Sequence, residues 1–150
     1  MPVHVVRLGS PRGKGEGLRI GTVRRPPRGV PKVEFASRDF YDVWLPDLAP
    51  SEGLVKLALG ARDEKAWRTF VRRYRAEMGR PEARRLLDLL AALSRETSFA
   101  VGCYCADEAR CHRSILRALL AERGAALNPA AAARATPSPE SPPRRRLRDG

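Results

Sequence analysis

The chain has few cysteines, and the three that it has stand close together. Its 150 residues contain Cys103, Cys105 and Cys111 and no other cysteine. A disulfide framework needs an even set of spaced cysteines, so this pattern excludes that class and favours a reducing compartment. No run of about eighteen apolar residues occurs, and the N-terminal MPVHVVRLGS lacks the basic and apolar regions of a secretory signal. We therefore expect a cytoplasmic protein with no membrane partner.

Acidic residues are scarce relative to basic ones, and the net charge is +12. Residues 1–32 carry a net charge of +7 and residues 129–150 carry +3, whereas residues 33–128 carry only +2. A strongly basic chain is a reason to consider nucleic acid as a partner. Because the middle of the chain is nearly neutral, nucleic acid stays an alternative and is not favoured.

Hydrophobic patterning predicts an α/β domain over residues 1–128. β-branched and apolar stretches predict buried strands over residues 3–9, 18–23 and 98–104. Apolar residues at helical spacing predict helices over residues 50–60, 63–78, 80–96 and 111–124. Strand segments that alternate with helical ones indicate a small, mostly parallel sheet covered by helices. The patterning gives no indication of the oligomeric state.

Two of these helices have apolar stripes that predict which side faces the core. In the segment 63–78 the stripe consists of Trp67, Phe70, Val71, Tyr74 and Met78. In the segment 80–96 it consists of Leu86, Leu89, Leu90 and Leu93. Between strand and helix, the stretch YDVWLPDLAPS predicts a long loop that Tyr41 and Trp44 anchor to the core. The C-terminal PAAAARATPSPESPPRRRLRDG (129–150) has no packable pattern, and we expect a disordered tail there.

The stretch CYCADEARCHR (103–113) brings the cysteines together with a histidine and an arginine. A phosphatase-like loop needs an arginine six residues after its cysteine, but Ala109 follows Cys103 at that spacing and Cys111 follows Cys105. A zinc site is an alternative, with Cys103, Cys105, Cys111 and His112 as its four donors. We do not favour it, because C-x-C spacing is awkward for chelation and adjacent Cys and His side chains should diverge at a helix start. We expect no metal and no other cofactor.

A strand that runs through a loop into a helix is where α/β proteins commonly bind ligands. Cys111 and His112 stand at the predicted helix start, where the helix dipole favours a thiolate, and we assign them as candidate catalytic residues. Arg113 would add a forked donor for a phosphate or carboxylate. The proline-stiffened loop RRPPRGVPK (24–32) also leaves a predicted strand, and its Arg24, Arg28 and Lys32 complete the candidate ligand-binding set.

The motifs along the chain resemble those of the DUF488 family, close to its YeaO-like branch, over about residues 3–124. The residues that match its motifs are Arg24, Pro27, Arg28, Gly29, Lys32, Tyr74, Glu77, Cys103, Cys111, His112 and Arg113. Cys105 stands where the family usually has glutamate. Val23 and Pro26 stand where the YeaO-like branch tends to have aspartate and tryptophan. The resemblance implies a compact α/β domain and no settled biochemical activity.

From these features we expect the domain to bind or process a small anionic ligand at the Cys111–Arg113 helix start. The ligand would carry phosphate or carboxylate, and a nucleotide-like molecule is one candidate. Whether it is an enzyme is left open. The alternatives are a nucleic-acid-associated basic module and a structural zinc-binding domain.

Overall fold

The computed structural model describes residues 2–129 and contains a four-stranded parallel sheet. The strands are β1 (Val3–Arg7), β2 (Leu18–Gly21), β3 (Val43–Trp44) and β4 (Phe99–Cys103), in the order β1-β4-β2-β3. All three strand pairs are parallel, and β4 lies in the centre between β1 and β2. Every residue of β4 is buried. The predicted α/β class and parallel sheet are therefore confirmed.

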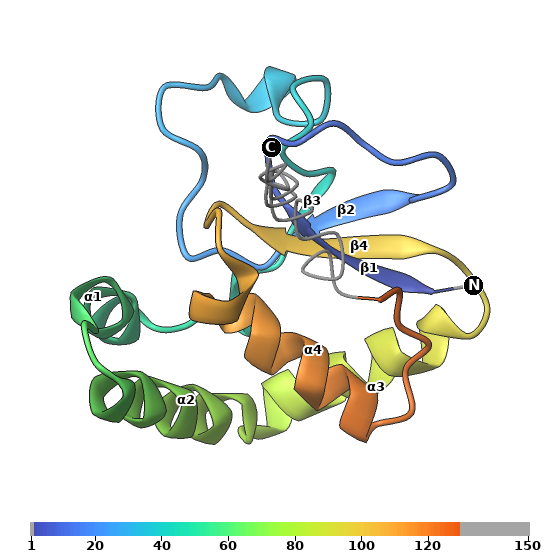
Figure 1. Ribbon diagram of the computed structural model, residues 1–150. Helices are drawn as coiled ribbons and strands as arrows, with labels where there is room; N and C mark the ends of the chain where they lie inside the picture. The colour runs from blue at the N-terminus through green and yellow to red at the C-terminus, as the bar shows by residue number, and fades with distance from the viewer. Residues whose placement is uncertain (1, 130–150) are drawn as a thin grey trace, which may run out of the picture.

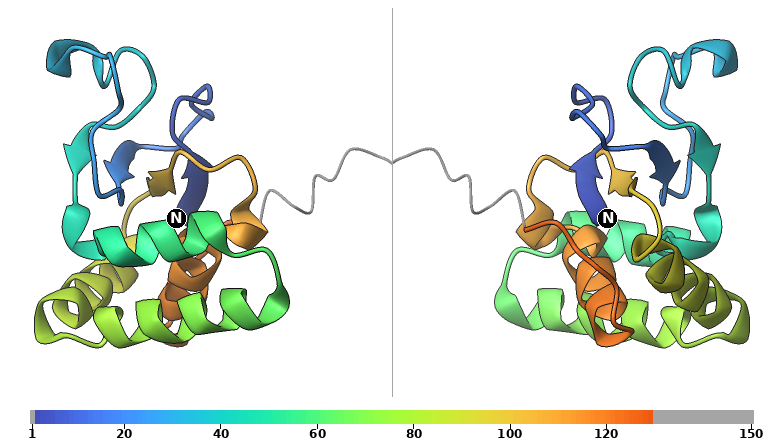
Figure 2. Two further views of the ribbon diagram at one scale, coloured as in Figure 1. Left: turned by 90° about the vertical axis from the view of Figure 1, so that its left-hand side faces the viewer. Right: turned by 90° about the vertical axis from the view of Figure 1, so that its right-hand side faces the viewer.

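The helices lie together on one side of the sheet, and the long segment between β2 and β3 lies on the other (Figures 1 and 2). They are α1 (Glu52–Gly60), α2 (Glu64–Met78), α3 (Pro81–Ser94) and α4 (His112–Glu122). Local sequence explains their starts: Ser51 and Asp63 accept hydrogen bonds from the backbone at the starts of α1 and α2, and Pro81 opens α3. None of the helices within residues 2–129 is long and apolar enough to cross a membrane.

The core face of α2 agrees with its predicted stripe, whereas that of α3 agrees only at Leu90 and partly at Leu86. Phe70, Tyr74 and Met78 are buried. In α3 the buried residues are Ala83, Leu87, Leu90, Ala91 and Ser94. Leu89 and Leu93 are 53% and 39% exposed. The buried side of the helix is therefore rotated, relative to the predicted leucine stripe, by about the angle between two consecutive residues. Small residues such as Ala83, Ala91 and Ser94 line the buried side because they allow the helix to approach its neighbours closely.

The segment between β2 and α1 departs from the expected loop in two respects. Residues 43 and 44 form the short edge strand β3, which the sequence pattern did not predict. Tyr41 is buried as expected, and its ring lies against Gly21, where any Cβ atom would clash with it. Trp44, however, is 44% exposed, and its indole N–H donates to the carbonyl of Val23 over 2.8 Å. Of the predicted tail 129–150, residues 130–150 lie outside the described part of the chain.

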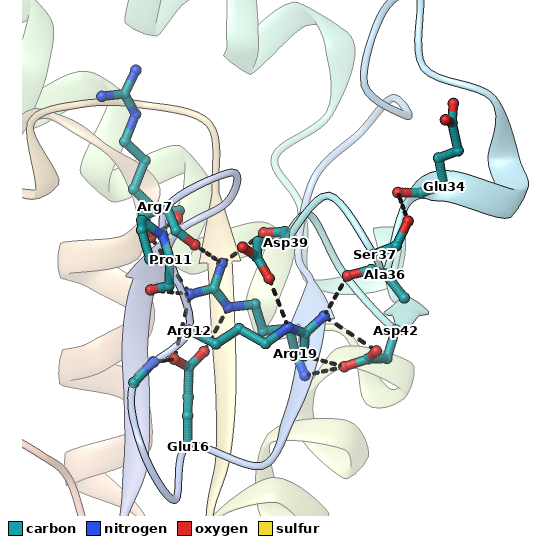
Figure 3. A network of polar contacts seen from close by, with 12 residues as sticks. Arg7, Pro11, Arg12, Glu16, Arg19, Glu34, Ala36, Ser37, Asp39 and Asp42 are labelled. Atoms are coloured by element: carbon teal, nitrogen blue, oxygen red, sulfur yellow. Dashed lines mark hydrogen bonds and ion pairs between the residues drawn. The ribbon is translucent and has the colours of Figure 1, made fainter.

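A buried ion pair fixes the loop that follows β1. Arg19, in β2, is 1% exposed, and its Nε donates to Glu16 over 2.6 Å (Figure 3). The rest of its guanidinium donates to the carbonyls of Ser10, Pro11 and Asp39. Arg19 therefore ties the turn-rich loop to the segment before β3. A second arginine, Arg12, pairs with Asp39 and Asp42 at the surface beside it.

This network gives the fold a predictable acid sensitivity. Burial raises the pKa of Glu16, but the hydrogen bonds from Arg19 and from the Gly13 N–H outweigh it, and the net shift is downward. A carboxylate with a lowered folded-state pKa contributes stability above its unfolded pKa and loses it as pH falls through the folded value. We expect urea-unfolding free energies to fall from about pH 5 to about pH 3. Glu16→Gln should flatten that decline, and an unchanged slope in this variant would contradict the assignment.

Candidate functional site

The carboxyl ends of β2 and β4 bring together the residues of the candidate site. The two strands are in register at Gly21 and Gly102, so Thr22, which follows β2, lies beside Cys103, the last residue of β4. Thr22 is tied to β4, because both its backbone N–H and its hydroxyl donate to the carbonyl of Gly102 over 3.0 Å. After β4 the chain makes a short loop and enters α4 (Figure 1). This strand–loop–helix arrangement is the one that the sequence predicted.

Two of the thiols and the imidazole form one buried group, the Cys–His cluster, made of Cys103, Cys111 and His112. The sulfurs of Cys103 and Cys111 are 2.9 Å apart, and Nδ1 of His112 is 3.7 Å from the sulfur of Cys111. The donor atoms of the three residues all lie within 4.8 Å of one another. The side chains are 3%, 3% and 7% exposed.

The expected divergence of Cys111 and His112 is therefore wrong, and the backbone explains why. Cys111 is the N-cap of α4 and has extended backbone angles, with φ −128° and ψ 153°, whereas His112 is the first helical residue. The change of conformation between them turns both side chains toward the end of β4. Spacing rules derived for two residues within one helix do not apply across such a junction.

Hydrogen bonding fixes the tautomer of His112. Its Nε2 lies 2.7 Å from the carbonyl oxygen of Thr22, and because a carbonyl can only accept, Nε2 carries the proton. Nδ1 is then left with a lone pair, which points toward the sulfur of Cys111. Burial lowers the pKa of His112 to about 4, so the ring is neutral near pH 7. The ring of Tyr74 packs edge-on against it at 5.6 Å and limits its rotation.

The third thiol, Cys105, differs from the other two in its exposure. It lies on the exposed loop after β4, and its backbone N–H donates to the sulfur of Cys103 over 3.3 Å. Contacts with the thiols of Cys103 and then Cys111 lower the pKa of Cys105. The contact with Cys103 lowers the pKa of Cys111, but the contact with Cys105 and burial outweigh it, so the net shift is upward. The pKa is therefore lowered for the exposed thiol and raised for the two buried thiols, Cys103 and Cys111.

A cavity of about 360 Å³ opens above this cluster. Cys103, Cys105 and His112 form part of its wall, so the cavity reaches the sulfurs and the imidazole. Its charged lining residues are Arg24, Arg25, Glu52 and Lys56. Arg25 forms an ion pair with Glu52, whereas neither Arg24 nor Lys56 has a carboxylate partner within residues 2–129. The cavity therefore combines sulfur and imidazole donors with an excess of positive charge.

The sequence-predicted ligand-binding residues do not all meet at this cavity. Arg24 lines it, and three backbone carbonyls hold its guanidinium, those of Pro46, Ala49 and Pro50. Arg28 lines an adjoining cavity of about 810 Å³, beside Phe40 and Tyr104. Lys32 is exposed and lines neither of these two cavities.

Two residues at the start of α4, Cys111 and Arg113, also lie outside the cavity wall, whereas His112 is part of it. Arg113 is buried behind the loop, where its guanidinium donates to the carbonyl of Cys105 over 2.5 Å, and it lines neither cavity. Cys111 is also set back from the cavity wall, whereas Cys105 is part of it. The catalytic assignment of Cys111 and His112 stays a prediction. The sequence analysis missed two residues of the site, Thr22 and Lys56. The position of Thr22 directly after a predicted strand could have indicated it, whereas nothing in the sequence pattern indicates Lys56.

Comparison with known proteins gives one finding. A family model described as DUF488-N3a, "Active DUF488-N3 subclade", matches residues 3–124. This span contains the sheet, all four helices and every residue of the candidate site. Searches of curated proteins and of solved structures returned no match.

Proposed function

The chain belongs to the DUF488 family, and we propose that in this member the cavity at the carboxyl ends of β2 and β4 binds a small anionic molecule. The observation that carries the proposal is the cavity of about 360 Å³, whose wall combines Cys103, Cys105 and His112 with positive charge. Its size lies within the range typical of small-molecule sites. Its place beyond the carboxyl ends of parallel strands is the usual ligand position in α/β sheets.

Positive charge in the cavity favours a phosphate or carboxylate group on the ligand. Lys56 reaches it from α1 and has no ion-pair partner in the described chain, so its ammonium is available to an anion. Arg24 uses Nε and Nη2 to bind carbonyls, and its Nη1 donates to no acceptor within residues 2–129. A guanidinium held by neutral carbonyls keeps its full charge and a fixed position. The lining also has apolar parts, including Val23, Pro50 and Val55, which suit a ligand larger than a free ion.

Calorimetric titration with inorganic phosphate and with adenosine monophosphate tests this proposal. We expect both probes to bind the wild-type chain, and Lys56→Glu to weaken binding by about tenfold or more, which corresponds to about 1.4 kcal/mol. The matched control is Lys65→Glu, which makes the same charge change on the exposed side of α2, away from the cavity. Binding to this control should stay within about twofold of wild type.

Three outcomes would contradict the proposal. One is that neither probe binds the wild-type chain. Another is that Lys56→Glu and Lys65→Glu weaken binding equally, since this would indicate attraction to overall charge. The third is that a DNA oligonucleotide binds with a steep salt dependence, and that neither Lys56→Glu nor Lys65→Glu changes its affinity. This is the result expected for the nucleic-acid alternative.

A further inference from the structure

We propose that the Cys–His cluster is a zinc site in which Cys103, Cys111 and His112 supply three ligands and the fourth position opens into the cavity. The donor set is the first reason. Thiolate sulfur and imidazole nitrogen are the ligands that zinc prefers, and three protein ligands with one open position are typical of catalytic zinc. This inference concerns the metal alone and does not depend on the anionic ligand proposed above.

One of the donor spacings matches a tetrahedral ion, and a second requires an adjustment. Zn–S bonds of about 2.3 Å place two sulfurs about 3.8 Å apart, and Zn–N bonds of about 2.0 Å give a sulfur–nitrogen spacing of about 3.5 Å. The 3.7 Å between the Cys111 sulfur and Nδ1 of His112 already agrees with this. The sulfurs of Cys103 and Cys111, 2.9 Å apart, are about 0.9 Å closer than this, so binding of zinc requires these two side chains to rotate apart.

His112 is prepared as a metal ligand by its surroundings. A ligating histidine commonly donates its other N–H to a backbone carbonyl, which fixes the tautomer and the direction of the lone pair. His112 makes this contact with Thr22, which is itself tied to Gly102 of β4. A disulfide between Cys103 and Cys111 would need neither the imidazole nor this orientation, so the arrangement of His112 favours the metal.

Charge balance also suits a buried metal. Cys103 and Cys111 would each release a proton to solvent as zinc binds, and the neutral His112 would bring no charge. Two thiolates then neutralise Zn²⁺, so the buried complex has no net charge to desolvate. Cys103 and His112 face the cavity and Cys111 lies behind them, which leaves the fourth position on the cavity side. Cys105 stands at that opening and is outside the group of donors that lie within 4.8 Å of one another.

Metal analysis of the full chain, purified under reducing conditions without a metal-binding tag, tests the site directly. We expect about one zinc ion per chain by elemental analysis. Chelation should lower the thermal midpoint, and added zinc should restore it. Cobalt added to the stripped chain should give the intense visible bands of a tetrahedral cobalt–thiolate centre. These measurements need no variant, so a substitution that prevents folding cannot obscure them.

Variants then test the ligand set and the open position. Cys111→Ser and His112→Gln, checked for folding by circular dichroism, should each lose most of the zinc, whereas Cys105→Ser should retain it. Lys56→Glu should also retain zinc while it loses anion binding, so failure of one proposal is distinguishable from failure of the other. The zinc site is overturned if the wild-type chain holds neither zinc nor cobalt, or if its mass shows a Cys103–Cys111 disulfide. Loss of zinc in Cys105→Ser would overturn the open fourth position.

Discussion

Replacing Arg19 with methionine is expected to lower the free energy of unfolding by about 3–5 kcal/mol, because it leaves the carboxylate of Glu16 buried without its partner. Glu16 is 4% exposed, and the guanidinium of Arg19 also satisfies three backbone carbonyls (Figure 3). Methionine fills a similar volume but can donate to none of these acceptors. Urea denaturation near neutral pH, where Glu16 is ionised, measures the loss.

Arg12→Met is the matched control for this prediction. Arg12 also pairs with carboxylates, those of Asp39 and Asp42, but its side chain is 26% exposed and water can replace its contacts. We expect this substitution to cost about 0–1 kcal/mol. Equal losses in the two variants would show that burial of the Arg19 pair is not what makes it important. A loss below about 1 kcal/mol for Arg19→Met would show that the loop readily exposes Glu16 to water.

Local patterns in the sequence predicted the elements of the fold well where burial was strong. The segment 98–104 is apolar after Ser98, and its residues 99–103 form the fully buried central strand β4. The strand–loop–helix order then located the site at the end of that strand, where Cys103 and His112 now meet. The helix 80–96 was placed correctly and Leu90 is buried as predicted, but the rest of the buried face was missed, because the four leucines outweighed Ala83, Ala91 and Ser94 in the pattern. Hydropathy ranks large apolar residues first, whereas close helix packing selects small ones.

What the sequence could not predict depends on backbone angles and on contacts between distant segments. The convergence of Cys111 and His112 follows from the extended N-cap, and neighbouring residue types do not specify those angles. The tautomer of His112 is set by Thr22, which is 90 residues away in the chain. Arg113 looked like a ligand-binding residue because it lies in the first turn of a helix, but the loop carbonyl of Cys105 accepts a hydrogen bond from its guanidinium. A cationic residue near a helix start can equally well serve the protein's own backbone.

The core and the candidate site are joined by a row of rings. The rings of Phe70 and Tyr74 are nearly parallel, with centroids 6.0 Å apart, and Tyr74 in turn packs edge-on against His112. The hydroxyl of Tyr74 donates to the carbonyl of Leu48 over 2.7 Å, which anchors the middle of the row. The position of His112 therefore depends on how tightly α2 packs, although α2 supplies no residue to the cavity wall.

Phe70→Ala is accordingly expected to cost about 3–5 kcal/mol of unfolding free energy, since Phe70 is 1% exposed and its loss would leave a cavity between Trp67 and Tyr74. Phe70→Leu keeps most of the volume and should cost about 1–1.5 kcal/mol. Urea denaturation of both variants provides the comparison. In the folded alanine variant, the freed Tyr74 ring should also broaden or shift the ring resonances of His112 in NMR spectra, and the leucine variant should change them less. Equal costs for the two variants would mean that the core around residue 70 collapses to fill the space left by the phenyl ring. Unchanged His112 resonances would show that the row of rings does not position the imidazole.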